Sequence, residues 1–394
     1  MSRSFLCRSR LTACVGLLAA ARLASAVAAE EVRYIDPQEA DGSSAAVVVP
    51  DEPLAFTQQL LPFDSGSRLP QQSGARQQID EVLRRAIGGA GRVVKLNVVA
   101  ADLDVAEEVR RALAGKFAGR QAKPAVSYVI SKLPQAGALV AMDAVWILPG
   151  EKIERAETSP SGPEFHSRIP AGPKVYVSGQ AEKGKNIEEM TRATMNSLGA
   201  TLVHVGLGWE DVAQVKAFIG PIAEAETARR VIEKRFDTSP PVVFVEWTTA
   251  PSIEIELVAS AVKAPGKSDD TVEFITPPGM TASPVFCRVT RVAAGPTIFI
   301  SGLYGKSQGD GQQETLEVFE QLGNLLEKTG SDFRHLAKAT YYVSTDEAGR
   351  KLNELRPRFY DPERPPAASK APVAGTGRDG KTITLDMIAA RGPK

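Results

Sequence analysis

The sequence predicts an α/β protein built from three tandem domains, and two observations carry this prediction. The first is a unit of strand, amphipathic helix and returning strand over residues 297–343, whose first strand places Ile298 and Ile300 at the two-residue period of a sheet. The second is that this unit recurs twice upstream. The ends of its first strands lie about 120 residues apart, at Thr57, Ser178 and Ser301. A repeat of that length is a whole domain, because solenoid repeats are much shorter.

The helices are predicted from apolar residues that share one helical face. In the third unit these residues are Leu316, Phe319, Leu322 and Leu326. Gly330 follows as a helix stop, because glycine accepts a left-handed backbone. The corresponding faces are Ile187, Met190, Thr194 and Leu198 in the second unit, and Ile79, Val82 and Ala86 in the first. A second helix is expected in every repeat, after the returning strand.

We place the repeats at residues 45–148, 165–262 and 272–391, with residues 30–44 as an irregular leader. Each repeat reads strand, strand, helix, strand, helix, strand, strand, with both helices on one face of a mixed sheet. The opposite sheet faces are also apolar, and an apolar face has to be buried somewhere. We therefore expect the three uncovered faces to pack together as an intramolecular pseudo-trimer, so that the protein is a monomer.

The N-terminus is typical of a secretory signal over residues 1–28. It has a basic start, a short apolar core over residues 11–21, and small residues at 24–28. An uncleaved membrane anchor is the alternative, but Arg22 interrupts the apolar run. Cleavage would make the protein secreted or periplasmic, without a membrane segment. It would also leave Cys287 as the only cysteine, so no internal disulfide is expected.

Composition excludes some functions. The 394 residues carry 47 basic and 47 acidic side chains, so no basic excess points to nucleic acid. No two of the three histidines (His166, His204 and His335) have the spacing of metal ligands, and no glycine-rich loop opens a helix. We therefore expect neither a metal nor a cofactor.

The order of Ser-Gly-Gln, amphipathic helix, glycine, Val-rich strand, second helix, Pro-Pro and acid-bearing strand resembles the RidA family, also called YjgF or L-PSP. The third repeat resembles it best, over residues 284–390, and the first is the most diverged. The resemblance implies a chorismate-mutase-like α/β fold. It also implies a trimer with small-molecule clefts between its subunits. Members of the family hydrolyse reactive enamines and imines.

The family's clefts use an arginine after a Pro-Ala pair to hold a substrate carboxylate, and a glutamate on the closing strand to activate water. This sequence lacks the arginine, with Ala368, Val243 and Val126 at the three positions. The acid is kept, as Asp143, Glu256 and Asp386. These three are the candidate catalytic residues, although structural acids satisfied by neighbouring groups are equally compatible with the pattern.

Four polar residues at the ends of the first strands are candidate ligand contacts, unless they only complete turns. They are Thr57, Ser178, Gln180 and Ser301. Two functions remain open. One is an exported small-molecule-binding protein that lacks imino-acid deaminase activity because the arginines are absent. The other is a hydrolase of reactive enamines or imines that uses the retained acids.

Overall fold

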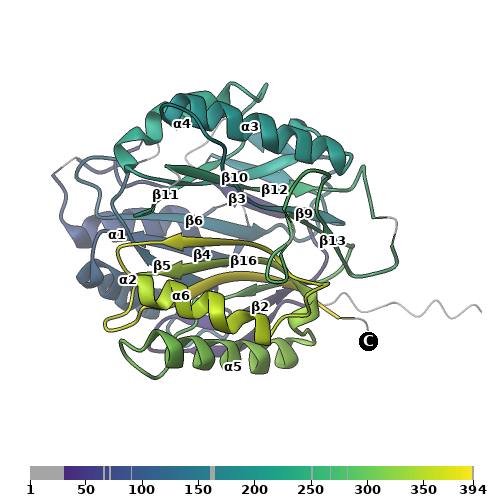
Figure 1. Cartoon of the computed structure of the whole chain (residues 1–394). Helices are drawn as coiled ribbons and strands as arrows, with labels where there is room; N and C mark the ends of the chain where they lie inside the picture. The colour runs from purple at the N-terminus through teal and green to yellow at the C-terminus, as the bar shows by residue number, and fades with distance from the viewer. Residues whose placement is uncertain are drawn as a thin grey trace, which may run out of the picture. The chain divides into compact units, whose positions relative to one another are not determined.

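Three modules follow one another along the chain and repeat one order of elements (Figure 1). The computed structural model describes residues 31–64, 67–70, 72–89, 91–159, 165–249, 252–266, 268–281 and 283–392. The expected signal, residues 1–28, lies outside the described residues. Residues 32–394 form one unit, which is the subject of the description below.

Each module consists of three strands, a helix, a strand, a helix and two strands. Module 1 contains β1 (Arg33–Gln38), β2 (Ser43–Val49), β3 (Leu54–Thr57), α1 (Ala75–Ile87), β4 (Arg92–Ala100), α2 (Leu103–Lys116), β5 (Ala125–Ile130) and β6 (Val140–Ile147). Module 2 contains β7 (Glu157–Ser159), β8 (His166–Ile169), β9 (Lys174–Gln180), α3 (Ile187–His204), β10 (Val212–Ile219), α4 (Ala225–Glu233), β11 (Val242–Glu246) and β12 (Ile253–Ser260). Module 3 contains β13 (Val272–Ile275), β14 (Val289–Val292), β15 (Thr297–Ile300), α5 (Gly311–Thr329), β16 (Leu336–Val343), α6 (Asp346–Leu355), β17 (Ala367–Pro372) and β18 (Ile383–Ala390).

Capping residues set the positions at which the helices begin and end. Asn186 caps α3 by accepting a hydrogen bond from the Glu189 amide at 2.9 Å, which satisfies one of the amides that a helix start leaves unpaired. Thr345 caps α6 in the same way. Gly330 ends α5 with φ of 80°, the left-handed conformation that the sequence predicts there.

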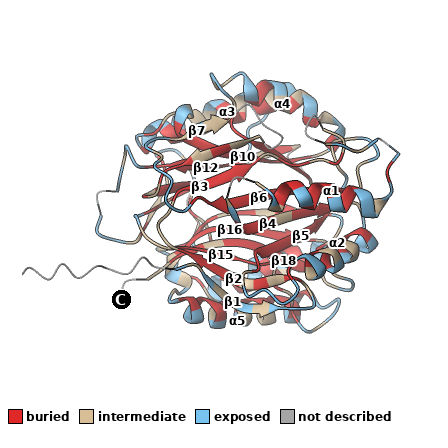
Figure 2. Cartoon of the chain, turned by 180° about the vertical axis from the view of Figure 1, so that it is seen from behind, coloured by how far each residue is buried: buried red, intermediate tan, exposed pale blue. Residues whose placement is uncertain are grey.

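In each module two helices cover one face of the sheet, as expected, and the outer helix surfaces are the exposed ones (Figure 2). The apolar helix faces and the sheets beneath them make three separate cores, one in each module. In module 3, for example, Val318 and Leu322 of α5 pack in the same cluster as Tyr341 of β16. A further cluster joins residues of all three modules, so the uncovered sheet faces do shield one another.

The leading hairpins connect the modules in a ring. The β7–β8 hairpin of module 2 pairs with β3 of module 1, and the β13–β14 hairpin of module 3 pairs with β9 of module 2. The ring closes because the β1–β2 hairpin of module 1 pairs with β15 of module 3. Residues 30–44 were expected to be irregular, and this was wrong, because β1 and the start of β2 lie there. The two-strand start predicted for each repeat also missed one strand per module.

The returning strands β4, β10 and β16 share a further detail. Each has a register shift at the same place, just before Lys95, Gln214 and Lys338 respectively. Such bulges redirect the following side chain. Both Lys95 and Lys338 consequently turn toward the junction of the modules, where the candidate acids also lie. Among the described residues, no helix is both long and apolar enough to cross a membrane.

Candidate functional site

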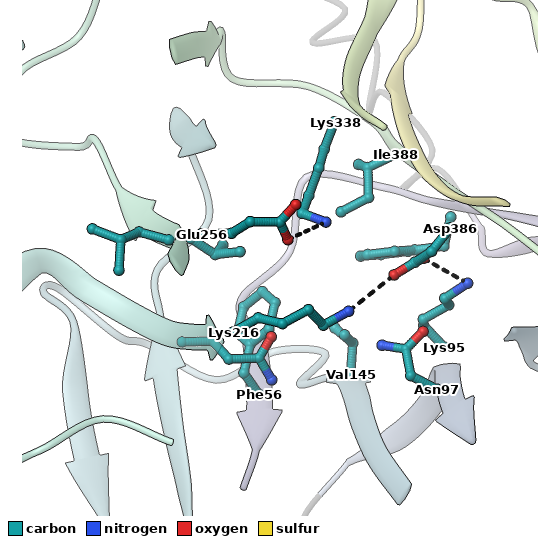
Figure 3. A pocket seen from close by; sticks show the side chains of 13 residues that line it. Phe56, Lys95, Asn97, Val145, Lys216, Glu256, Lys338, Asp386 and Ile388 are labelled. Atoms are coloured by element: carbon teal, nitrogen blue, oxygen red, sulfur yellow. Dashed lines mark hydrogen bonds and ion pairs between the residues drawn. The ribbon is translucent and has the colours of Figure 1, made fainter. Parts of the chain in front are cut away.

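The three candidate catalytic acids lie at equivalent places in the fold. Asp143 on β6 faces Asn97, Glu256 on β12 faces Lys216, and Asp386 on β18 faces Thr340. All three side chains are buried. They point into the junction of the modules, and Glu256 and Asp386 line a small chamber there (Figure 3). They do not lie in clefts between neighbouring modules, where the resemblance places a water-activating acid.

Lysines from all three modules pair with Asp386 and Glu256. Lys95 of module 1 lies 3.0 Å from an Asp386 carboxylate oxygen, and Lys216 of module 2 lies 3.3 Å from the other. Lys338 of module 3 pairs with Glu256 of module 2 at 3.0 Å. Every one of these pairs joins two modules, which Figure 3 shows from close by.

The electrostatics of the acids differ. Burial alone would raise the pKa of Asp386, but the ammonium groups of Lys95, Lys216 and Lys338 outweigh it and hold that pKa well below its usual range. Burial raises the pKa of Asp143, and no lysine approaches it as closely. Its carboxylate accepts a hydrogen bond from the Asn97 amide at 2.8 Å. Asp386 is thus held as a carboxylate, whereas Asp143 favours its neutral form.

The chamber is too small for an organic ligand. Its volume is about 30 Å³, space for roughly two water molecules at about 10–15 Å³ each. Besides the charged residues it is lined by the amides Asn97 and Gln214 and by apolar side chains such as Phe56, Val145 and Phe299. A second apolar cluster from all three modules, containing Val99, Phe218 and Tyr342, packs further along the same three strands. The small volume and the ion pairs between modules favour a structural role for Glu256 and Asp386.

The strand-end polar residues are buried as well. The Thr57 hydroxyl accepts a hydrogen bond from the Ala144 amide at 2.9 Å. The Ser301 hydroxyl accepts from the Val126 amide at 2.7 Å and donates to the Ser44 carbonyl. Gln180 donates to the Thr201 hydroxyl at 2.8 Å. The Ser178 hydroxyl alone has no partner among the described residues. Three of these four candidates therefore complete the backbone or side-chain structure around them.

The arginine positions need one correction. Sheet register aligns Ala368, opposite Ala339, with Val126, opposite Leu96. In module 2 the same register position is Val242, opposite Val215, which is one residue before Val243. The side chains at the corrected positions pack on the helix side of their sheets. None of these three described positions carries an arginine. Arg364, four residues before Ala368, pairs instead with Asp270 at 3.2 Å.

Sequence reasoning missed Glu254, two residues before Glu256 on the same strand face. Its carboxylate lies against Gly179, where an added Cβ would come within 1.9 Å of it. The Ser369 hydroxyl of module 3 hydrogen-bonds to it and also accepts from the Gly179 amide at 2.9 Å. Burial and the charge of Glu256 raise its pKa to about 7, against the opposing effects of Ser369 and Arg288. The signal was present in the sequence as the alternation Ile253-Glu-Ile-Glu256, which places both acids on one face.

Glu254 lines an open pocket of about 490 Å³ at the boundary between modules 2 and 3. Lys370 and Pro372 of β17 line the pocket. Module 2 contributes Trp247 and Glu254, and module 3 contributes Val343, Lys370 and the first turns of α6 with Asp346 and Arg350. Near Glu254, Arg288 of module 3 donates to the Gly179 carbonyl at 3.4 Å. Within the described residues, no group of three His, Cys, Asp or Glu side chains could hold a metal ion.

Comparison with known proteins bears on module 2 most directly. The family model described as Endoribonuclease L-PSP matches residues 157–262. A 2-iminobutanoate/2-iminopropanoate deaminase from Mus musculus is 28% identical over 104 residues, which is 25% of this chain and 76% of the relative. Residues 157–262 belong to the RidA family. This RidA domain begins at β7 and ends just after β12, so the matched segment coincides with module 2.

Three solved structures that match this chain each cover about a third of it. A YjgF-family protein from Neisseria meningitidis is 20% identical and covers 31% of this chain and 97% of its own, with a TM-score of 0.24. A conserved Rid-family protein of unknown function from Yersinia pestis is 19% identical and covers 30% and 98%, with a TM-score of 0.29. A YjgF-type protein from Mycobacterium tuberculosis is 17% identical and covers 30% and 98%, with a TM-score of 0.23.

Proposed function

We propose that this chain is an exported, RidA-like, small-molecule-binding protein in which one polypeptide supplies all three modules of a pseudo-trimer. Its ligand site is the pocket between modules 2 and 3. The observation that carries the proposal is the placement of Glu254, an acid that reaches an open pocket of about 490 Å³. Of the three acids that the sequence singles out, Glu256 and Asp386 instead line the central chamber, and Asp143 is buried near it.

The three module boundaries differ in their polar groups, which supports Glu254 as the distinguishing residue, although a pocket of about 480 Å³ also lies where modules 3 and 1 meet. At the boundary of modules 1 and 2, the Gln59 side chain fills the corresponding position and exchanges hydrogen bonds of 2.8 and 3.2 Å with the Phe244 backbone. Where modules 3 and 1 meet, the Gly302 amide donates to the Val126 carbonyl at 2.9 Å, which ties the strand end to β5. At these two boundaries the residues at the Glu254 position are Ala141 and Thr384, neither of which can ionise.

Imino-acid deamination as the family performs it does not fit the residues present. Ala368, Val126 and Val242 leave no planar guanidinium fork at the register positions described above, and such a fork is what holds a carboxylate in two parallel hydrogen bonds. Arg288 is near Glu254, but it donates to the Gly179 carbonyl and its guanidinium packs 5.0 Å from the Phe286 ring centre. The pocket therefore binds its ligand through other groups.

A second candidate function is hydrolysis of a reactive imine or enamine in the same pocket. Glu254 favours it, because a carboxyl group with a pKa of about 7 can both donate and accept a proton near neutral pH. The mouse relative is named for such a deaminase activity. In this scheme Glu254 would protonate the substrate nitrogen and then take a proton from the attacking water.

The experiment compares wild-type protein with Glu254→Gln and with Glu226→Gln, an exposed acid on α4 that serves as the matched control. Ammonia release is measured from imino acids generated by an amino-acid oxidase, and ligand binding is measured by thermal shift across a panel of small metabolites. Binding without ammonia release, lost only in Glu254→Gln, supports the binding protein. Ammonia release lost only in Glu254→Gln supports the hydrolase. Binding that survives in Glu254→Gln excludes this pocket.

Export and assembly are tested on the protein itself. N-terminal sequencing of protein recovered outside the cytoplasm should begin within a few residues of Ala28, ahead of β1 at Arg33. Gel filtration with light scattering should give a particle of one chain, because strands of all three modules already pack in the shared core. A stable particle of three chains would contradict the pseudo-trimer.

A further inference from the structure

Lys370 occupies an unusual place in the pocket between modules 2 and 3. It is half-buried on β17 and points to the helix side of the sheet, where a Cβ added to Gly349 would lie 3.9 Å from its Nζ. Its amino group has no hydrogen-bond or ion-pair partner among the residues that the structure describes. A buried lysine without a counter-ion loses hydration without compensation, which disfavours its charged form.

The groups around Lys370 also disfavour its charged form. Its Nζ lies over the first half of α6, where the helix dipole is positive and opposes a second positive charge. Burial and then the charge of Arg356 lower the pKa of Lys370. Two acids, Asp346 and Glu254, line other parts of the pocket, but neither lies within ion-pair distance of Lys370. The amine is thus poised to act as a neutral nucleophile, a role for which desolvated lysines are suited.

Arg350 gives the pocket a second positive group. It extends from the exposed side of α6 and lines the same pocket, also without an ion-pair partner among the described residues. An arginine of this kind can hold a carboxylate or another planar anion. Trp247 and Val343 provide apolar walls between the polar groups.

We propose that this pocket binds a small aldehyde or ketone that carries an anionic group, with the anion on Arg350 and the carbonyl carbon bonded to Nζ of Lys370. The neutral amine attacks the carbonyl carbon, and the C=O electron pair moves to oxygen, which takes a proton. Loss of that oxygen as water, with the remaining N–H proton going to solvent, leaves a C=N bond. One carbonyl and one amine give one imine and one water, without oxidation or reduction.

This step uses the pocket of the proposed function but a different atom, so the two can fail separately. Carbonyl capture by Lys370 requires no proton transfer by Glu254, and ammonia release by Glu254 requires no covalent bond to Lys370. A protein that fails the ammonia and ligand-panel assays could still form the imine.

The test is site-resolved labelling of the full protein with glyoxylate, an aldehyde with a carboxylate, in the presence of cyanoborohydride to trap the imine. Peptide mass spectrometry then compares Lys370 with Lys351, an α6 lysine that pairs with Glu354. We expect Lys370 to be modified at least about tenfold faster, and its rate to rise with pH as the amine loses its proton. Equal rates at the two lysines in wild-type protein would overturn the proposal without any variant.

Three substitutions test the assignment of the two groups further. Arg350→Ala should slow modification of Lys370 by glyoxylate several-fold while leaving its modification by propanal, which has no anion, unchanged. Lys370→Arg should remove the fast site, whereas Lys351→Arg should keep it. If Arg350→Ala slows both aldehydes equally, or neither, the assignment of the anion to Arg350 is wrong.

Discussion

Lys95 and Asp386, which are far apart in the sequence, meet as a buried ion pair of 3.0 Å that joins module 1 to module 3. The Lys95 amino group also donates to the Ile300 carbonyl and the Ser127 hydroxyl, both at 2.7 Å. Its charge is thus fully coordinated by groups of two modules. Asp386 in turn reaches Lys216 of module 2, so a single carboxylate connects all three modules.

The pair between Lys338 and Glu256 should be costly to break from one side. In Lys338→Met, Glu256 keeps only the 3.1 Å hydrogen bond from Thr340 and remains as a buried charge, which typically costs about 3–5 kcal/mol. In the double variant Lys338→Met with Glu256→Leu no charge is stranded, and much of the loss should be recovered. Urea unfolding followed by fluorescence measures both. Lys351→Met, at the exposed pair with Glu354, is the control and should change little.

Asp386 and Asp143 should respond to pH in opposite directions. The pKa of Asp386 is lowered by folding, so its contribution to stability is present above its unfolded pKa of about 4 and is lost as pH falls. The pKa of Asp143 is raised, so its contribution is present at low pH and is lost as pH rises. Asp386→Asn should lower stability at pH 7 and flatten the decline in acid.

The matched variant is Asp143→Asn, which should leave stability at pH 7 unchanged or improve it, since the neutral amide avoids burying a charge. Thermal melts between pH 3 and pH 8 compare the two variants with the wild type. Equal losses at pH 7 in both would mean that the two acids are equivalent, against the ion-pair geometry.

Glu254→Gln should stabilise the protein at alkaline pH. Folding raises the Glu254 pKa to about 7, so deprotonation in the folded state costs free energy as pH rises above its unfolded value near 4. Removing that cost should gain about 1–3 kcal/mol at pH 8 and much less at pH 4. Melting temperatures at the two pH values measure it. A loss of stability at pH 8 would show that the charged carboxylate is needed there.

Much of the fold could be predicted from the sequence, because repeated periodicities report on local structure. The three helical faces, the stop at Gly330 and the shared burial of the uncovered sheets all follow from patterns within about 20 residues. The ring of hairpins could not be predicted, since nothing in β1 or β2 specifies that the partner is β15. The two strands are separated by most of the chain, and only the assembled modules decide the pairing.

The site was harder to predict for a related reason. Asp143, Glu256 and Asp386 were correctly aligned with one another, but spacing does not tell whether a strand face meets a cleft or the centre of the molecule. The lysines that pair with Glu256 and Asp386 lie on other strands, and two of the three follow bulges that sequence patterns do not reveal. Glu254 was overlooked because only module 2 has an acid at that position.

The last prediction concerns the ring. The Arg33 guanidinium donates to the Thr329 carbonyl at 3.2 Å, and the Gly392 amide donates to the Gly330 carbonyl at 3.0 Å. The first strand and the last described residues therefore lie close together, because they bind the neighbouring carbonyls of Thr329 and Gly330. A circular permutant that joins residue 392 to residue 32 through a short flexible linker and opens the chain between residues 159 and 165 should fold to the same structure, because every strand keeps its partner.

Deletion of residues 32–50 should have the opposite result. It removes the β1–β2 hairpin and leaves β15 as a bare edge, and unpaired edges promote association with other chains. We expect the deleted protein to aggregate or form oligomers, whereas the permutant, which contains the same hairpin, stays a single-chain particle in gel filtration. The unopened chain with the same linker appended after residue 392 is the control for the effect of the linker itself. A soluble, monomeric deletion variant with an unchanged melting temperature would mean that the hairpin does not close the ring.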